Sequence, residues 1–224
     1  PDCWSNLGVC YRELAQYDES IRCYDEALKL KPDHAECWSN RAIALHYTAR
    51  FSEAEEAYKQ SLQLKPDRAD AHFGLASILL TQGRWLEGWK EYEWRRFMKE
   101  SGPVRSFAQP LWDGTAQPDK TLLLFVEQGL GDTLQSLRFL ALARARVGRL
   151  ILEVQPSLYR LVQAAVGDTI LVRQGEAHPP FDVYAPLMSL PALLGMTVAD
   201  LPAPPSYLSA EPERVKYWQA KLPQ

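Results

Sequence analysis

The sequence predicts an α-helical solenoid followed by one α/β lobe built on a parallel sheet. One observation is a 34-residue period, in which the same apolar pattern returns three times within residues 1–100. The other is an alternation of apolar, strand-like runs with helical segments over residues 121–224. A chain of 224 residues is long enough for two such domains, and we expect a connector over residues 101–120 between them.

The repeated pattern places apolar and small residues at matching positions of each period. The first period holds Trp4, Leu7, Gly8, Tyr11, Tyr24, Ala27 and Pro32, the second Trp38, Ala42, Leu45, Ala54, Tyr58 and Pro66, and the third Leu75, Ala76, Leu79, Gly88 and Tyr92. The period and its Trp-x2-Leu-Gly-x2-Tyr head resemble the tetratricopeptide repeat, a helix–turn–helix unit that stacks into a solenoid. The resemblance divides the array into repeats 1–34, 35–68 and 69–100.

Each repeat is expected to contain helix A over its positions 2–14 and helix B over its positions 18–31. The turns between the helices are expected near residues 15–16, 49–50 and 82–83. Pro32 and Pro66 end helix B, because proline disfavours helix in the residue before it. The third repeat lacks this proline, so we expect its last face to meet another domain.

Helix A lines the concave groove of such arrays, so its polar residues are candidates for ligand contact. Asn6 and Asn40 hold the same groove position, and Gly74 interrupts the series. This pair resembles the peptide-holding ladder in the repeats of O-GlcNAc transferase, which implies a protein or peptide partner. Asparagine is also common at this position, and that explanation stays open. The basic clamp that some repeats use for a C-terminal carboxylate is missing, since its positions hold Asp2, Ser5, Glu36 and Ser39.

The connector contains three prolines and two glycines, which is typical of an extended segment. Phe107, Leu111 and Trp112 are too apolar for a free linker, so we expect the connector to pack along the last repeat. Array and lobe would then move as one body.

The lobe, residues 121–224, begins with an apolar run over 121–127 that is typical of a strand buried on both faces. A helix over about 133–147 and a strand over 149–154 follow. Pro156 opens a second helix, and two further strands are expected at 170–172 and 181–184. About four strands form one Rossmann-like lobe with a parallel sheet.

The loop 128–132 follows the first strand, at the sheet edge where α/β proteins bind ligands. As a dinucleotide fingerprint it is weak, because Leu134 replaces the third glycine, although Glu153 could hold a ribose. As a phosphate-binding P-loop it fails, because Gly-Lys-Ser/Thr is absent.

The segment Glu127–Gln135 resembles the opening of the glycosyltransferase-like domain in bacterial tetratricopeptide proteins, which is similar to lipopolysaccharide heptosyltransferases. The resemblance extends through Trp112-Asp-Gly in the connector to Pro186-Leu-Met-Ser-Leu-Pro in the lobe. It implies the N-terminal half of a two-lobe, GT-B type glycosyltransferase. Asp132 matches the general base of that family, and the expected substrate-binding residues beside it are Gln128, Gly129, Gly131 and Thr133.

Asp132 also stands at a helix start, where aspartate is a good N-cap, so capping is an open alternative to catalysis. The family holds its nucleotide-sugar donor on a second lobe, which this sequence lacks. The chain also starts at Pro1, at the first position of a repeat, with no Met. We therefore expect a truncated fragment, inactive alone, of a metal-independent sugar transferase. The competing class is a non-enzymatic interaction scaffold with a degenerate lobe.

Composition excludes several other classes. The formal net charge of −3 shows no basic excess, so we expect no nucleic-acid partner. No apolar run reaches about 18 residues, so no membrane span is expected. The four scattered histidines and four cysteines lack metal-ligand spacing, so we expect neither metal nor cofactor. Small buried cysteines without a signal peptide indicate a reducing, cytoplasmic setting.

Overall fold

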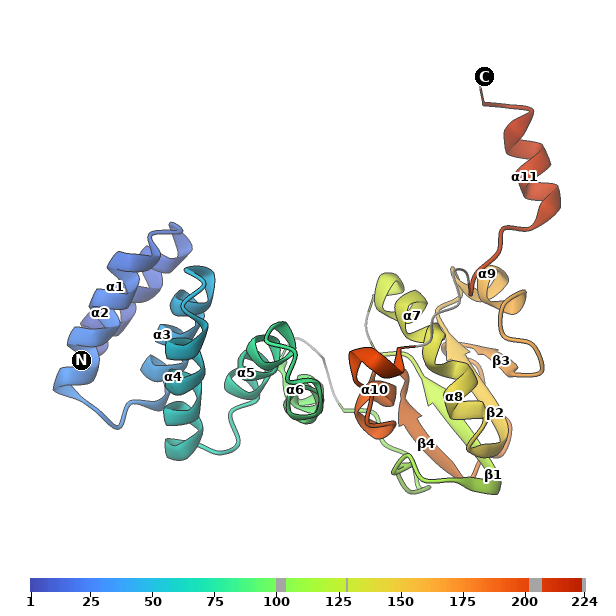
Figure 1. The fold of residues 1–224 in the computed structure, drawn as a ribbon, viewed down its shortest axis with the longest axis horizontal. Helices are drawn as coiled ribbons and strands as arrows, with labels where there is room; N and C mark the ends of the chain where they lie inside the picture. The colour runs from blue at the N-terminus through green and yellow to red at the C-terminus, as the bar shows by residue number, and fades with distance from the viewer. Residues whose placement is uncertain (100–103, 128, 202–206, 223–224) are drawn as a thin grey trace. The chain divides into compact units, whose positions relative to one another are not determined.

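The computed structural model describes residues 1–99, 104–127, 129–201 and 207–222. The chain divides into two compact units, Pro1–Val104 and Arg105–Gln224. The first is helical and the second contains the sheet (Figure 1).

The first unit contains three consecutive helix pairs, as the 34-residue period predicts. The pairs lie next to one another in chain order (Figure 1). They are α1 (Asp2–Glu13) with α2 (Tyr17–Leu30), α3 (Ala35–Tyr47) with α4 (Phe51–Leu64), and α5 (Ala69–Thr81) with α6 (Trp85–Tyr92), which runs into the 3-10 helix η1 (Glu93–Phe97).

The turn inside each helix pair reverses through one residue of left-handed backbone. Ala15 and Ala49 have φ of 57°, and Gly83 has φ of 77°. These residues lie one period apart and each follows a helix A, where a left-handed residue commonly ends a helix. The sequence therefore repeats its turn geometry as well as its apolar pattern.

The helix pairs pack through buried tyrosines that face glycines. A Cβ atom on Gly8 would lie 2.6 Å from Cε1 of Tyr24, and one on Gly74 would lie 2.2 Å from Cζ of Tyr58. Tyr58 belongs to the preceding repeat, so Gly74 allows the second and third repeats to approach. Gly74 therefore interrupts the asparagine series because Tyr58 leaves no room for a side chain at this position.

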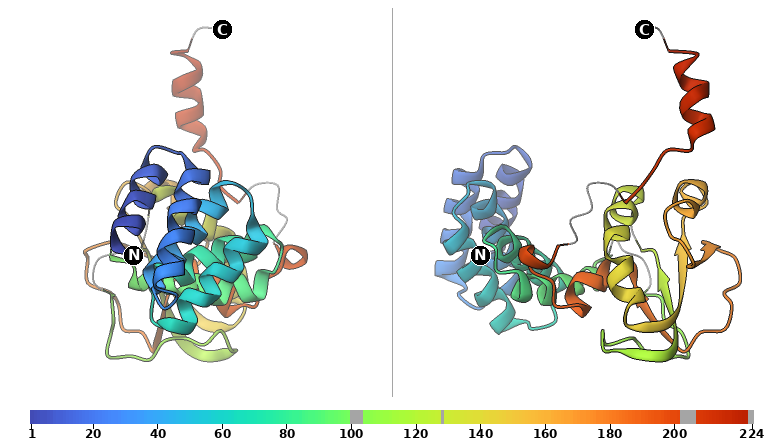
Figure 2. Two further views of the ribbon diagram at one scale, coloured as in Figure 1. Left: turned by 90° about the vertical axis from the view of Figure 1, so that its left-hand side faces the viewer. Right: turned by 45° about the vertical axis from the view of Figure 1, so that its right-hand side comes forward.

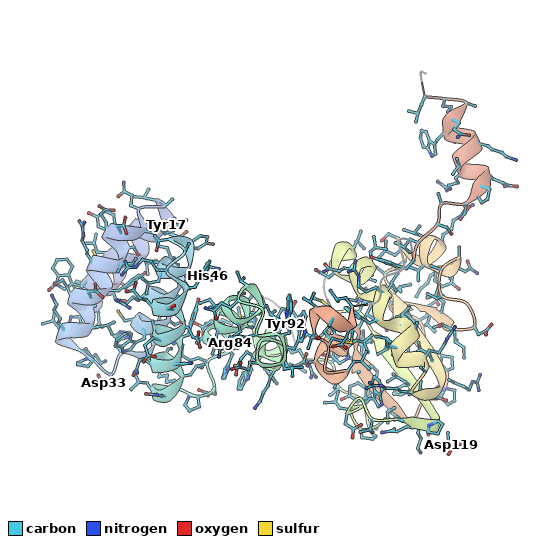
Figure 3. All side chains as sticks on the ribbon, in the orientation of Figure 1. Tyr17, Asp33, His46, Arg84, Tyr92 and Asp119 are labelled. Atoms are coloured by element: carbon cyan, nitrogen blue, oxygen red, sulfur yellow. The ribbon has the colours of Figure 1, made fainter. Side chains whose placement is uncertain are left out.

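Two repeats also join through an ion pair. Arg84, labelled in Figure 3, contacts Glu55 of the second repeat at 2.7 Å and Glu87 at 2.6 Å. Burial raises the pKa of Glu55, but hydrogen bonds from Lys59 and Arg84 outweigh it and hold the pKa below its ordinary value.

The second unit contains a four-stranded parallel sheet with strand order β3-β2-β1-β4. The strands are β1 (Gln117–Phe125), β2 (Val147–Val154), β3 (Ile170–Arg173) and β4 (Val183–Pro186). The helices are α7 (Leu130–Ser136), η3 (Leu137–Phe139), α8 (Leu140–Arg144), α9 (Tyr159–Gln163), η4 (Leu187–Ser189), α10 (Leu190–Leu193), η5 (Val198–Asp200) and α11 (Pro212–Gln219).

Alternate residues of the central strands enter two different cores. Leu122, Leu124 and Val126 pack with residues of α8, α9 and α10 in the larger core. In Figure 2, right, the yellow-green helices α7 and α8 lie along one side of the strands. Leu123 and Phe125 point to the other face, which a smaller aromatic core covers. Burial on both faces explains the continuous apolar run of β1.

The segment that precedes β1 packs on this sheet. Trp112 donates its backbone N–H to the Tyr184 carbonyl at 2.8 Å, and the Tyr184 N–H donates to the Pro110 carbonyl at 3.2 Å. Phe107 stacks edge-on against Tyr184, with ring centroids 4.8 Å apart. The composition of the connector predicts that these aromatic residues pack along the last repeat. Their contacts instead lie within the second unit, because β4 offers an open edge, and Leu111 stays half-exposed.

Two helix boundaries differ from those expected. The helix expected over 133–147 begins at Leu130 and is divided by η3, and β2 already starts at Val147. Pro156 lies in a turn before α9 and does not open that helix. Across the described ranges, no helix combines the length and apolarity required to cross a membrane.

Candidate functional site

The residues predicted to line a peptide groove are Asn6 on α1 and Asn40 on α3. Asn6 is exposed and Asn40 is partly buried. The Oδ1 atom of Asn40 accepts a hydrogen bond from Nη1 of Arg12 at 3.2 Å, which links the helix A segments of the first two repeats. Nδ2 of Asn40 donates no hydrogen bond to any residue that the structure describes, so this amide keeps two donors for a ligand.

Asn40 lines a polar cavity of about 470 Å³ in the first unit, beside the start of α5. Asp70 in this cavity accepts hydrogen bonds from Arg68 at 2.5 Å and from Ser39 at 3.1 Å. Nε of Arg68 is buried without a hydrogen-bond partner among the described residues. The other lining residues are Glu36, Asp67, Ala69, Phe97, Met98 and Lys99.

The positions of a carboxylate clamp are unsuited to an acidic ligand. Ser5 and Ser39 are buried, with 6% and 0% of their surface exposed. Glu36 is exposed in the cavity wall. Arg12 and Arg68 are not predictable as site residues from the sequence, since neither belongs to the repeated apolar pattern.

The second candidate site is the loop between β1 and α7. Gly129 is the N-cap residue of α7, and its N–H donates to Oδ2 of Asp132 at 3.2 Å. Asp132 is therefore the third helical residue and not the N-cap, although its carboxylate still caps the helix start. Thr133 is buried and donates to Oε1 of Gln155 at 3.0 Å. Gln128 lies outside the described residues.

Gly131 has open space beside it, since no atom lies within 4 Å of the position of a Cβ atom. The loop follows the carboxyl end of β1, which pairs with β2 on one side and with β4 on the other. Strand order thus reverses at β1, and ligands of open parallel sheets bind at such a point.

Glu153 on β2 is engaged elsewhere. Its buried carboxylate contacts Arg105 at 2.5 and 2.9 Å and His178 at 2.7 Å. Burial raises its pKa, but the hydrogen bonds from Arg105 and His178 outweigh burial and lower the pKa below its ordinary value. A carboxylate with these partners has no room for a ribose, which argues against the dinucleotide alternative.

Histidines have structural contacts in both units. Nε2 of His72 lies 2.8 Å from the Pro66 carbonyl oxygen and Nδ1 contacts Glu91, and His72 stacks on Trp94 at 4.0 Å. Trp38 makes the equivalent bond to the Pro32 carbonyl one repeat earlier, at 2.8 Å. Within the described part of the chain, no three His, Cys, Asp or Glu residues are arranged to hold a metal ion.

The helix pairs and their 34-residue period define a tetratricopeptide array. Models of the tetratricopeptide repeat match residues 3–67 and 47–88. The chain is similar to Protein FlbA of Caulobacter vibrioides, with 30% identity over 242 residues that cover 98% of this chain and 40% of FlbA. The chain thus spans about two fifths of the length of that curated relative.

Solved repeat domains are similar to part of this chain. The first repeat domain of Spaghetti (RPAP3), bound to the HSP90 peptide SRMEEVD, has 22% identity and a TM-score of 0.42 over 45% of this chain and 79% of its own. The OM64 repeat domain of Arabidopsis has 17% identity and a TM-score of 0.43, over 46% and 85% of the two chains.

Proposed function

We propose that the repeats bind an extended peptide segment of a partner protein along the helix A face. The observation that supports this most is the placement of Asn40 in the wall of a polar cavity, with its Nδ2 donors unused within the described residues. Arg12 fixes the Asn40 side chain through Oδ1, so the amide is oriented before a ligand arrives. An oriented amide recognises backbone carbonyls without demanding a particular side chain.

The charges of the cavity favour a basic partner peptide. Asp70 is neutralised by Arg68. The remaining charged groups of the cavity are two carboxylates, on Glu36 and Asp67, and one ammonium group, on Lys99. Residues 1–100 carry 17 Asp and Glu against 14 Lys and Arg, so the array as a whole is also acidic. Charge complementarity steers association and rejects partners of like charge.

The test compares three fluorescein-labelled peptides by anisotropy: a lysine-bearing extended peptide, its glutamate counterpart, and SRMEEVD. The lysine peptide is expected to bind most tightly and to weaken with salt, because exposed charges are screened. Tighter binding of SRMEEVD would contradict a basic partner.

We further propose that the second unit places an acceptor hydroxyl beside Asp132, for sugar transfer from a nucleotide-sugar held by another lobe. The support is the position of Asp132 in the first turn of α7, the helix that follows β1, where the strand order reverses. A carboxylate within about 3 Å of a hydroxyl can take its proton as the sugar is transferred. Gly129 and Gly131 would let the acceptor approach the backbone, and Thr133 would hold the loop in place.

A non-enzymatic scaffold is the second candidate, and one observation favours it. Oδ2 of Asp132 already accepts the Gly129 N–H, and the Thr133 hydroxyl is bonded to Gln155. The loop therefore has a purely structural explanation. Release of free nucleotide from a panel of nucleotide-sugars, measured on a longer protein that contains this chain, separates the two candidates.

A further inference from the structure

The second unit contains a cavity of about 260 Å³. It lies between the helical segment 137–144 and the turn that precedes β3. This turn leads into the amino end of β3, so the cavity lies away from the carboxyl-edge loop 127–133. We call its apolar lining residues the apolar wall; they are Leu137, Leu140, Ala141, Ala165 and Val166. We call its other lining residues the polar wall; they are Arg138, Arg144, Gly167, Thr169 and Tyr207.

Among the described residues, neither of the two arginines in this wall has an acidic partner. Nε of Arg138 is buried with no hydrogen bond among the described residues, while its guanidinium carbon lies 5.4 Å from the ring centroid of Tyr207. Arg144 forms no ion pair within 4.0 Å of a carboxylate in the described ranges. Its Nη1 atom lies 3.1 Å from where a Cβ atom on Gly167 would stand, so this glycine leaves room for the guanidinium.

Three other arginines of the same unit are engaged. Arg105 binds Glu153, Arg160 binds Glu211, and Arg146 donates to the Gly114 carbonyl at 2.8 Å. A buried guanidinium N–H without an acceptor is costly, because it has lost its water without gaining a partner. One such group, on Arg138, and the exposed guanidinium of Arg144 on the same cavity leave a place for an anion.

We propose that this cavity binds a small phosphate monoester, with Arg138 and Arg144 on its phosphate and the apolar wall against its organic part. Two guanidinium charges match the charge of a phosphate monoester, which is about −1.5 to −2 at pH 7. Arginine presents a planar fork of donors that fits phosphate oxygens in pairs. The volume is just below the usual range of about 300–1,000 Å³ for ligand pockets, so it suits a compact ligand better than a nucleotide-sugar.

The experiment is calorimetric titration of the 224-residue chain with phenyl phosphate, inorganic phosphate and benzoate at constant ionic strength. Phenyl phosphate is expected to bind most tightly, since it alone satisfies both walls. Arg138→Gln and Arg144→Gln should each weaken it by about tenfold or more, the usual effect of losing a charge-assisted hydrogen bond. Arg149→Gln removes an exposed arginine of β2 outside the cavity and serves as the matched control.

Absence of binding to the wild-type chain would overturn the proposal. Equal losses in the Arg149 control would also overturn it, because they indicate a general charge effect. Benzoate binding as tight as phenyl phosphate would contradict the phosphate assignment. If Arg138→Gln fails to fold by circular dichroism, Arg144→Gln decides alone, since the Arg144 side chain is exposed and does not support the core.

Discussion

The guanidinium of Arg105 forms a bidentate ion pair with Glu153, at 2.5 and 2.9 Å, although Glu153 is completely buried. The guanidinium carbon also lies 4.7 Å from the ring centroid of Phe125 on β1. The pair therefore stabilises the packing of the segment around Arg105 on the inner strand β2. Breaking a buried pair by removing one partner is strongly destabilising, because the other charge stays buried.

This pair predicts a specific acid sensitivity. The pKa of Glu153 is held below its ordinary value of 4.5, so its stabilising effect is complete above about pH 4.5. The effect is lost as the pH falls through the lowered pKa. The thermal midpoint of the second unit should decrease when the pH is lowered from 6 to 3, and Glu153→Gln should make that decrease smaller. The control Glu176→Gln, at an exposed glutamate, should keep the wild-type pH dependence; an unchanged profile for Glu153→Gln would refute the assignment.

Two glycine substitutions should differ in their effect on the free energy of unfolding. Gly8→Ala places a Cβ atom 2.6 Å from the ring of buried Tyr24, and overpacking of this kind costs about 1–3 kcal/mol. Gly131→Ala has open space in α7 and should be neutral or stabilise by up to about 1 kcal/mol, since alanine is the better helix former. Urea unfolding measures both. A Gly8→Ala variant as stable as the wild type would show that Tyr24 moves freely.

The turns and strands follow from local patterns, so the sequence predicts them. Ala15, Ala49 and Gly83 end their helices one period apart, and the apolar run of β1 requires two covered faces. The start of α7 was misplaced, because Gly129 and not Asp132 is the N-cap residue. Glycine has no side chain that would identify it as an N-cap residue, whereas aspartate is a preferred N-cap residue.

The tertiary contacts could not be predicted from one sequence. Arg105 and Glu153 are 48 residues apart, and no spacing rule connects them. The Arg12–Asn40 bond depends on how two repeats stack, and the sequence predicts only that Asn40 lies on helix A. Gly74 was understood only as a missing asparagine, while Tyr58 of the neighbouring repeat fills that space.

The cysteines should differ in reactivity towards iodoacetamide at pH 8. Cys3 and Cys10 are exposed, contrary to the expectation of small buried cysteines, whereas Cys23 and Cys37 are buried as expected. Burial raises the pKa of Cys37 to about 11, so only about one thiol in a thousand is ionised at pH 8, and the thiolate is the reactive form. Mass spectrometry should find two labels in the native chain and four after unfolding. Rapid native labelling of Cys37 would contradict the packing of α2 on α3.

Substitution of the Asp132 carboxylate distinguishes a catalytic role from a helix-capping role. In a longer protein with transferase turnover, Asp132→Asn should reduce turnover by about 100-fold or more, since general-base catalysis contributes about 10²–10⁴. Stability should change little, because asparagine keeps an oxygen that can accept the Gly129 N–H. Asp168→Asn, at an exposed aspartate, is the control. Intact turnover with lowered stability would leave Asp132 as a helix cap only.

The most direct test of the peptide-binding account is the dissociation constant of the lysine-bearing peptide for Asn40→Ala, measured by anisotropy. We predict a constant about tenfold larger than that of the wild type, because the variant loses the oriented amide and leaves Arg12 without this acceptor. The control Gln60→Ala, at a partly buried amide on α4 that donates to Glu56, should match the wild type. An unchanged constant for Asn40→Ala, or an equal loss in Gln60→Ala, would contradict binding along the helix A face.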